Sequence, residues 1–224
     1  MTNDYSRILA NQLDAKIINQ QLSTPQPVLH SLENTSHAAV ALIIEPAGKD
    51  HWSILFIERA TRKGDPWSGQ IAFPGGRREK HDVDSEAVAL RETEEEIGIR
   101  INERSVIGRL DDLPGRHGGT SAGMVISCFV YMLDHVADIR VNNEVKSVVR
   151  VPVDHLLDIN NYVNVLWAKQ QETCYPGISF GDDDKHIVWG LTYRFLRTFF
   201  NRLGCRLPEA AILREQQFRQ RPFY

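Results

Sequence analysis

The 224-residue sequence has few cysteines, no long apolar run and no large excess of either charge. Its three cysteines, Cys128, Cys174 and Cys205, are odd in number and widely spaced, so they form neither a metal motif nor a disulfide framework. No stretch reaches about 18 apolar residues and the N-terminus lacks an apolar signal segment, so we expect a cytoplasmic protein without a membrane segment. The formal net charge of -3 gives no general attraction to nucleic acid or membrane surfaces.

The composition is that of an ordinary globular protein, with 42% hydrophobic and 25% charged residues. We expect a main domain over 36–205, preceded by a helix and connecting loop within 1–35 and followed by a tail over 206–224. Apolar residues at helical spacing predict an amphipathic helix over 3–22 that packs on the core, ended by Pro25 and Pro27. The sequence leaves open whether the protein is a monomer or a homodimer.

Apolar runs predict the strands of a sheet. The run 38–44 is continuous and apolar, which is typical of a buried strand, and a strand at 52–57 follows closely enough to form a hairpin with it. Further elements are expected as strands at 105–110, 124–133 and 148–152, a short helix at 154–159, and a strand continuing into a helix over 186–202. Loops or turns are expected at 45–50, 58–68, 111–119, 175–177 and 181–184.

Four glutamates lie within the five positions 92 to 96, at the end of the most informative stretch, 69–99. In a helix, Glu92, Glu95 and Glu96 share one face, because residues three and four positions apart are neighbours. Like charges at these spacings destabilise a helix by roughly 0.2–0.5 kcal/mol per pair. A divalent cation would reverse that effect, and carboxylate oxygens are the ligands that Mg²⁺ and Mn²⁺ prefer.

The flanking residues support a helix at this position. Arg91 lies one turn before Glu95 and can brace it, and Gly98 is a natural C-cap. Positions 82–85 offer residues that cap helix N-termini. An isolated acidic run is most often a solvated helix face, but a run that combines a bracing arginine, a capping glycine and an upstream glycine pair indicates a metal site.

These residues resemble the Nudix box of the Nudix hydrolases. The matching positions are Gly76, Arg91, Glu92, Glu95, Glu96, Gly98 and Ile99. Three departures accompany the match: Asp82 stands where the common box has glutamate, the gap from it to Arg91 is one residue longer, and Thr93 fills a position that is usually aliphatic. The Asp and the longer gap both occur in the coenzyme A pyrophosphatase branch, which the chain therefore resembles.

The resemblance implies an α/β fold, an α/β/α sandwich with a mixed β-sheet. It also implies that Glu92, Glu95 and Glu96 hold Mg²⁺ or Mn²⁺, with a backbone carbonyl of Gly76 as a further ligand. Many Nudix enzymes place an additional carboxylate in a later loop, and Glu144 is the residue that fits here. Glu92 or Glu144 would then accept the proton of the attacking water, and Arg91 would support the glutamates.

The coenzyme A branch has a second pattern upstream of the box. Its downstream half is intact as Gly69, Phe73, Pro74, Gly75 and Gly76. The upstream half fits if the loop is one residue longer, with Ile57 in place of Thr and Arg62 or Lys63 in place of the pattern's Arg. Together with Arg59, these cations could bind anionic substrate groups.

The resemblance therefore implies a hydrolase of a small-molecule nucleoside diphosphate derivative, with coenzyme A as the leading substrate and 3′,5′-ADP and 4′-phosphopantetheine as products. Two alternatives remain open. One is a Nudix enzyme for another substrate, such as ADP-ribose, NADH or a nucleoside triphosphate. The other is a catalytically silent Nudix domain that senses a nucleotide, against which the intact glutamates argue.

Overall fold

A computed structural model describes residues 14–30, 35–48, 51–63, 67–117, 120–134, 136, 138–167, 174–181, 185–208 and 220–223. The helices are α2 (Ala15–Ser23), α3 (Ser85–Ile97), α4 (Val153–Leu157) and α5 (Gly190–Arg202), with short 3₁₀ turns at Glu103–Ser105 and Ile159–Asn161. The strands are β1 (Ser36–Pro46), β2 (Trp52–Arg59), β3 (Ile71–Ala72), β4 (Gly75–Arg77), β5 (Val106–Arg109), β6 (Leu113–His117), β7 (Thr120–Met132), β8 (Val145–Pro152), β9 (Tyr162–Trp167), β10 (Cys174–Phe180), β11 (His186–Trp189) and β12 (Gln220–Phe223).

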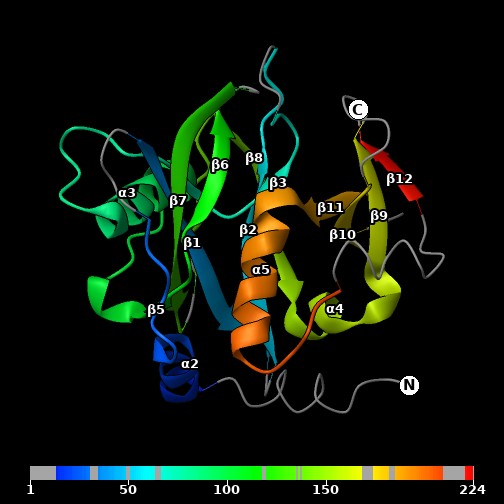
Figure 1. The fold of residues 1–224 in the computed structure, drawn as a ribbon, viewed down its shortest axis with the longest axis horizontal. Helices are drawn as coiled ribbons and strands as arrows, with labels where there is room; N and C mark the ends of the chain where they lie inside the picture. The colour runs from blue at the N-terminus through cyan, green and yellow to red at the C-terminus, as the bar shows by residue number, and fades with distance from the viewer. Residues whose placement is uncertain are drawn as a thin grey trace.

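The larger sheet is mixed and is built around β1 (Figure 1). Its strand order is β3-β2-β1-β7-β5, with β4 also paired to β1, β6 to β7 and β8 to β2. β1 and β2 form the predicted hairpin, with Ile43 opposite Leu55, although β1 runs to Pro46 and so is longer than the apolar run. β1 pairs with β7 in parallel, which makes the sheet mixed as predicted.

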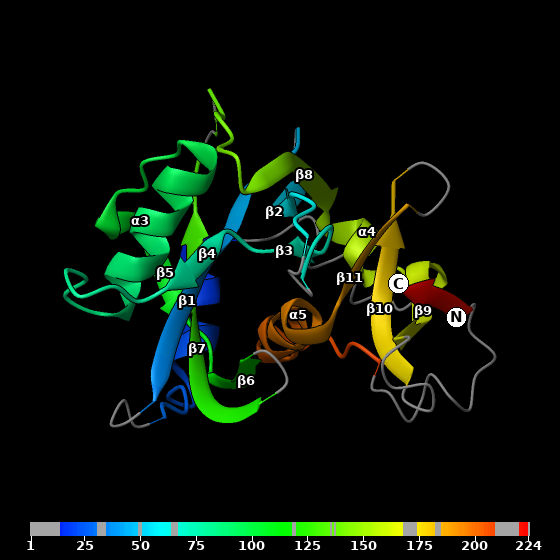
Figure 2. The same cartoon turned by 90° about the horizontal axis from the view of Figure 1, so that it is seen from above.

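Both faces of this sheet are buried, which explains why β1 is apolar without alternation. Leu42 and Ile44 of β1 belong to a core cluster that includes residues of α2 and α5. Ala41 and Ile43 point to the other face, into a cluster that includes residues of α3. Figure 2 shows α3 and α5 on opposite sides of β1 and β7. The predicted α/β/α sandwich is confirmed.

A second sheet, with strand order β11-β10-β9-β12, lies beyond α5 (Figure 2). It is packed against the main sheet through Phe56 of β2, whose ring centroid is 6.4 Å from that of Phe180 in β10. β12 comes from the C-terminal tail and runs parallel to β9. Residues beyond position 205 therefore contribute to the fold, and Leu207 also belongs to the buried core.

Two predicted loops are wrong. Residues 111–119 were expected as a loop, but 113–117 form β6, which pairs with β7. The turn expected at 175–177 is part of β10, where Gly177 lies opposite Trp189. A Cβ on Gly177 would come within 2.8 Å of Ile187 and of Val165, so this glycine serves close strand packing and not a turn. The turn expected at Asp182–Asp184 lies outside the described residues.

The N-terminal helix prediction is confirmed in its second half. α2 begins after Asp14, whose side chain accepts hydrogen bonds from the backbone N–H groups of Lys16 and Ile17. Positions 3–13 lie outside the described residues. α2 ends at Ser23, before Pro25, as predicted. Ile18 and Leu22 are buried in the main core, which agrees with a packing role.

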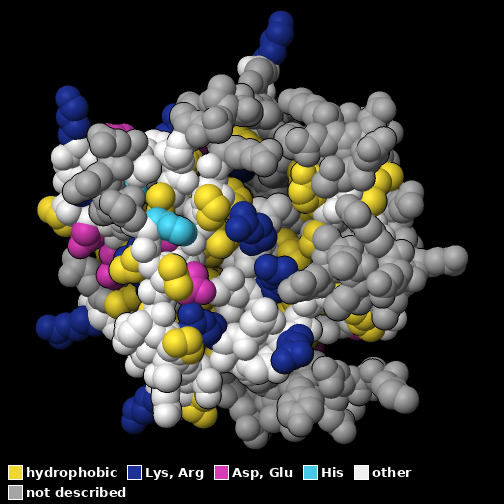
Figure 3. Space-filling model, in the orientation of Figure 1, with side chains coloured by type: hydrophobic (Ala, Val, Ile, Leu, Met, Phe, Trp, Pro, Cys, Tyr) yellow, Lys and Arg dark blue, Asp and Glu magenta, His cyan; other side chains and the backbone are white. Residues whose placement is uncertain are grey.

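None of the helices in the described part of the chain is long and apolar enough to cross a membrane. In Figure 3, basic side chains over and around α5 lie among hydrophobic and uncharged atoms. The described atoms on this face form no continuous basic field.

Candidate active site

The acidic helix α3 is positioned by capping interactions that its sequence encodes. Asp84 is the N-cap, and its side chain accepts a hydrogen bond of 2.8 Å from the N–H of Ala87. Gly98 ends the helix in the left-handed conformation, with φ 75°. Thr93 fills the box position that is usually aliphatic, and it is fully buried. Its hydroxyl donates to the carbonyl of Ala89 at 2.7 Å, so the buried polar group has a hydrogen-bond partner.

The turn between β3 and β4 faces the glutamates. The N–H of Gly75 donates to Glu96 Oε2 at 2.9 Å. A Cβ on Gly76 would lie 2.3 Å from the Glu92 carboxyl group, so the missing side chain leaves the space that this carboxyl group occupies. Gly75 has φ 153°, and a Cβ there would lie 2.3 Å from the Ala39 carbonyl oxygen. Gly75 is therefore required by the close approach of backbone, whereas the missing side chain of Gly76 makes room for the Glu92 carboxyl group.

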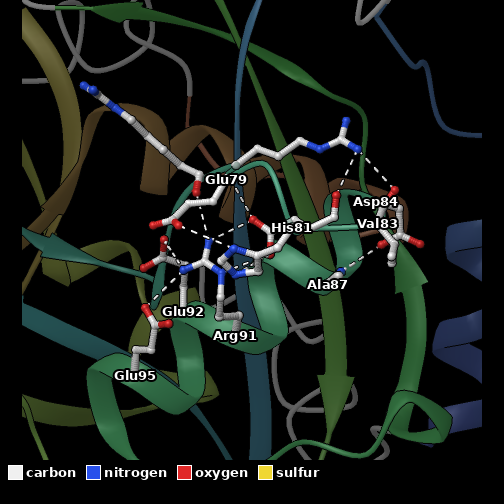
Figure 4. A network of polar contacts seen from close by, with 11 residues as sticks. Glu79, His81, Val83, Asp84, Ala87, Arg91, Glu92 and Glu95 are labelled. Carbon is white, nitrogen blue, oxygen red and sulfur yellow. Dashed lines mark hydrogen bonds and ion pairs between the residues drawn. The ribbon is translucent and has the colours of Figure 1, made fainter.

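Arg91 lies at the centre of the polar network in Figure 4. Its guanidinium donates to both carboxylate oxygens of Asp82, at 2.9 and 3.0 Å. It also donates to Glu92 at 3.0 Å, to Glu95 at 3.1 Å and to the carbonyl of Arg77 at 3.0 Å. The predicted bracing role of Arg91 is thus extended to Asp82, the residue that replaces glutamate in the common box. Its contact with Asp82 also holds the pKa of that carboxyl group below its usual value.

Two of the glutamates have raised pKa values. The pKa of Glu96 is raised to about 8, chiefly by burial and also by the charges of Glu92 and Glu144, while the Gly75 N–H opposes the shift. Burial also raises the pKa of Glu92, where Arg91 opposes the shift and the charges of Glu95 and Glu144 add to it. Glu95 is largely exposed. Perturbed carboxyl groups of this kind are typical of functional sites.

The fold brings Glu144 near the same glutamates, since its charge raises the pKa of both Glu92 and Glu96. It lies directly before β8, and its carboxylate accepts a hydrogen bond of 3.0 Å from Arg62. The sequence suggested Arg62 as a substrate-binding cation and Glu144 as an additional carboxylate. It did not predict the ion pair between them, because that pair depends on where two loops distant in sequence meet.

The other two predicted cations lie close to Arg62 in sequence, but the loop expected at 58–68 begins only after Arg59. Arg59 ends β2, and its charge acts to lower the pKa of Glu96, so it is electrostatically coupled to the acidic cluster. Lys63 is exposed, and the loop positions 64–66 that follow it lie outside the described residues.

The side chains that could hold a cation supply oxygen ligands. Glu92, Glu95 and Glu96 come from one helix, and Gly76 in β4 lies beside the Glu92 carboxyl group and could add its carbonyl oxygen. Such oxygen ligands suit Mg²⁺ or Mn²⁺. Within the described ranges, no three acidic, histidine or cysteine side chains are already arranged as a metal site. Instead the carboxylates are held by Arg91 and by the Gly75 N–H. The donor chemistry of these carboxylates suits the cation, and to bind it they would have to rotate away from Arg91 and the Gly75 N–H.

Comparisons with known proteins agree with this geometry. A model of the NUDIX domain matches residues 35–169. An uncharacterized Nudix hydrolase, NudL, from Photorhabdus laumondii is 32% identical over 175 residues, which cover 77% of this chain and 87% of that protein. A NudL protein from Yersinia pestis is 26% identical over 198 residues, covering 86% of this chain and 96% of that one.

Among solved structures, a MutT/nudix family protein from Enterococcus faecalis is similar, with a TM-score of 0.53 and 16% identity. The match covers 96% of this chain and 80% of that chain and shows a common fold. The chain therefore belongs to the Nudix family and is a Nudix hydrolase, of a family that acts on nucleoside diphosphate derivatives and generally uses divalent metal ions.

Proposed function

We propose that this Nudix hydrolase uses Mg²⁺ or Mn²⁺ to cleave the diphosphate bond of coenzyme A, giving 3′,5′-ADP and 4′-phosphopantetheine. The observation that carries the hydrolytic part is the pair Glu92 and Glu96, held against the Gly75–Gly76 turn with raised pKa values. The choice of coenzyme A rests on the resemblance of residues 69–76 to the second pattern of the coenzyme A branch.

The site residues have distinct roles in this proposal. Glu92, Glu95, Glu96 and the Gly76 carbonyl would hold the cation, which would neutralise charge on the diphosphate and supply an activated water. Glu144 accepts the proton of the attacking water, with Glu92 as the alternative acceptor. Arg91 orients Glu92 and Glu95 through its hydrogen bonds.

The cations beside the site select the substrate. Coenzyme A carries a 3′-phosphate that ADP-ribose lacks. Arg59, at the end of β2, acts electrostatically on Glu96, and Arg62 and Lys63 follow it in the adjoining loop. A charge-assisted hydrogen bond to phosphate contributes about 1.5–3 kcal/mol. Exchanging Arg62 and Lys63 for Ala should therefore raise KM for coenzyme A by roughly one to two orders of magnitude and leave KM for dephospho-coenzyme A nearly unchanged.

A product-release panel tests the proposal. Coenzyme A, dephospho-coenzyme A, ADP-ribose, NADH and nucleoside triphosphates are each incubated with Mg²⁺, with Mn²⁺ and with excess EDTA. We expect metal-dependent hydrolysis with coenzyme A as the best substrate. Preference for ADP-ribose would overturn the substrate assignment, full activity in EDTA would overturn the metal assignment, and tight binding without turnover of any compound would indicate a nucleotide sensor.

A further inference from the structure

Two loops far apart in sequence are joined beside the acidic cluster. The first follows β2 and contains Ala60 and Arg62, and the second precedes β8 and ends at Glu144. The N–H of Ala60 donates to the carbonyl of Glu144 at 2.8 Å. Ser68 fixes the backbone of the first loop, because its hydroxyl accepts from the Arg62 N–H and donates to the Arg62 carbonyl, both at 2.9 Å. The Arg62 side chain is thereby presented to the second loop.

The Arg62 guanidinium binds the carboxylate proposed as the base. It donates to Glu144 Oε1 at 3.0 Å, and its other terminal nitrogen lies 3.3 Å from Asn143 Oδ1 and 3.4 Å from the Asn143 carbonyl oxygen. The side chains of Arg62 and Glu144 are 45% and 43% exposed. An exposed ion pair of this kind is weak and readily exchanged, whereas a planar guanidinium binds a phosphate group strongly through paired hydrogen bonds.

The backbone of Glu144 is held independently of Arg62. Its N–H donates to Asn142 Oδ1 at 2.8 Å, and the N–H of Asn142 donates to the carbonyl of Glu96 at 3.0 Å. Glu144 is thus tied to the end of α3 whether or not Arg62 is bound to it. Loss of the ion pair would release the carboxylate and leave the backbone in place, next to the glutamates that its charge already influences.

We propose that Arg62 is an exchangeable clamp: it holds the Glu144 carboxylate in the substrate-free protein, and a substrate phosphate takes its place and frees that carboxylate to act as base. This inference rests on the proposed function, which assigns Arg62 to substrate and Glu144 to the water. The freed carboxylate takes one proton from the water as the water oxygen bonds to phosphorus. The bond to the bridging oxygen breaks, and that oxygen leaves with the other phosphate group. Arg62 thereby couples recognition of the phosphate to availability of the base.

A binding cycle without metal tests the clamp, because no hydrolysis then occurs. Coenzyme A is titrated by calorimetry in excess EDTA into the wild type, Arg62→Ala, Glu144→Gln and the double variant. In the wild-type background, Glu144→Gln removes the competitor for Arg62, and we expect the Kd to fall roughly three- to tenfold. In the Arg62→Ala background, the same exchange should leave Kd within about twofold.

The alternative outcomes are distinct. Equal tightening in both backgrounds would show plain repulsion between Glu144 and the ligand, and no tightening in the wild type would show that the two do not compete. Either result overturns the clamp. Arg100→Ala is the control variant. Arg100 also forms an exposed ion pair, with Glu94, but neither residue belongs to the proposed site, so the exchange should not change the Kd for coenzyme A.

Failure of the substrate assignment would be recognised separately. A wild-type protein that hydrolyses ADP-ribose with Mn²⁺ and does not bind coenzyme A contradicts the proposed substrate only. The four-protein cycle is then titrated with ADP-ribose, and the same comparison between the two backgrounds decides whether Arg62 exchanges Glu144 for a phosphate.

Discussion

Gly75 and Gly76 are neighbours in the sequence, but a side chain would meet different atoms at each. At Gly75 it would strike the backbone of Ala39 and Val40, in a conformation that residues other than glycine rarely adopt. At Gly76 it would meet only the end of the Glu92 side chain, which can rotate away. The two positions therefore separate a structural requirement from a functional one.

This difference gives a paired prediction. Gly76→Ala should fold with a Tm close to that of the wild type, but displacement of the Glu92 carboxyl group should lower kcat by at least about tenfold and weaken Mn²⁺ binding. Gly75→Ala should be strongly destabilised, because its Cβ would clash with the backbone of Ala39 and Val40, which cannot rotate away as a side chain can. Thermal melts, Mn²⁺ titrations and steady-state kinetics check both. A Gly76→Ala protein with wild-type kcat would mean that the position of Glu92 is unimportant.

Glu96 offers a prediction about pH. Its pKa is raised by burial to about 8, above the ordinary value of 4.5, so the folded protein binds a proton that the unfolded chain releases between these two values. Metal-free wild-type protein should therefore lose stability, on the order of a few kcal/mol, as the pH rises from about 4.5 to about 8. Glu96→Gln should show much less of this loss, because the amide stays neutral and its oxygen can still accept from Gly75, and only the raised pKa of Glu92 then contributes.

The matched control is Glu95→Gln, which removes the same charge from an exposed position on the same helix. Its metal-free stability should stay within about 0.5 kcal/mol of the wild type across this pH range. Both variants should lower kcat by at least about a hundredfold in the presence of metal. Denaturant unfolding at several pH values and steady-state kinetics test these expectations. An unchanged pH dependence in Glu96→Gln would show that another group causes the loss.

Sequence alone predicted the glutamate face and the brace by Arg91, because both follow from helical spacing within one segment. It could not predict the Gly75 N–H bound to Glu96, or the Arg62–Glu144 ion pair. These contacts join segments that are 21 and 82 residues apart. The geometry of these contacts depends on where the sheet places the loops, and local sequence patterns do not predict that placement.

Among the elements, α3 shows how local chemistry fixes both ends of a helix. The N-cap and C-cap were predicted from residue type and are confirmed at Asp84 and Gly98. The end of α3 also positions the following loop, since the Ile97 carbonyl accepts from Arg140 and the Glu96 carbonyl accepts from Asn142. The mistaken turn at 175–177 had equally strong local signals, Pro and Gly, but there packing between neighbouring strands decided the conformation.

Gly98→Ala should destabilise the protein by about 1 kcal/mol, because alanine is strained at φ 75°. For a protein of this size the loss corresponds to a fall in Tm of roughly 2–4 °C. Gly98→Asn should lose less, since asparagine tolerates the left-handed conformation better. Differential scanning calorimetry of the three proteins tests the order. Equal stability of the alanine and asparagine variants would contradict the conformational explanation.

At the scale of the whole molecule, the main sheet was predictable and the second sheet was not. The continuous apolar run 38–44 indicated a buried strand, and the Nudix resemblance implied an α/β/α sandwich. α3 and α5 cover the two faces of the sheet (Figure 2). One edge of the second sheet is β12, a four-residue strand from a tail whose sequence carries no strong strand pattern. Its pairing with β9 is a long-range contact, which no local sequence pattern predicts.

Removal of residues 220–224 should therefore destabilise the protein while sparing the chemistry. β12 supplies the parallel partner of β9, with Gln220 opposite Asn164 and Phe223 opposite Trp167. Its loss leaves β9 as an open edge, so we expect a Tm lower by roughly 3–6 °C, about 1–2 kcal/mol, and a greater tendency to aggregate. Helix α3, which carries the glutamates, and β12 lie on opposite sides of the main sheet (Figure 2), so kcat should stay within about threefold. A variant lacking only Tyr224 is the control. A shortened protein with unchanged Tm would show that β12 adds no stability, and one that keeps its Tm but loses kcat would place the tail in the catalytic site.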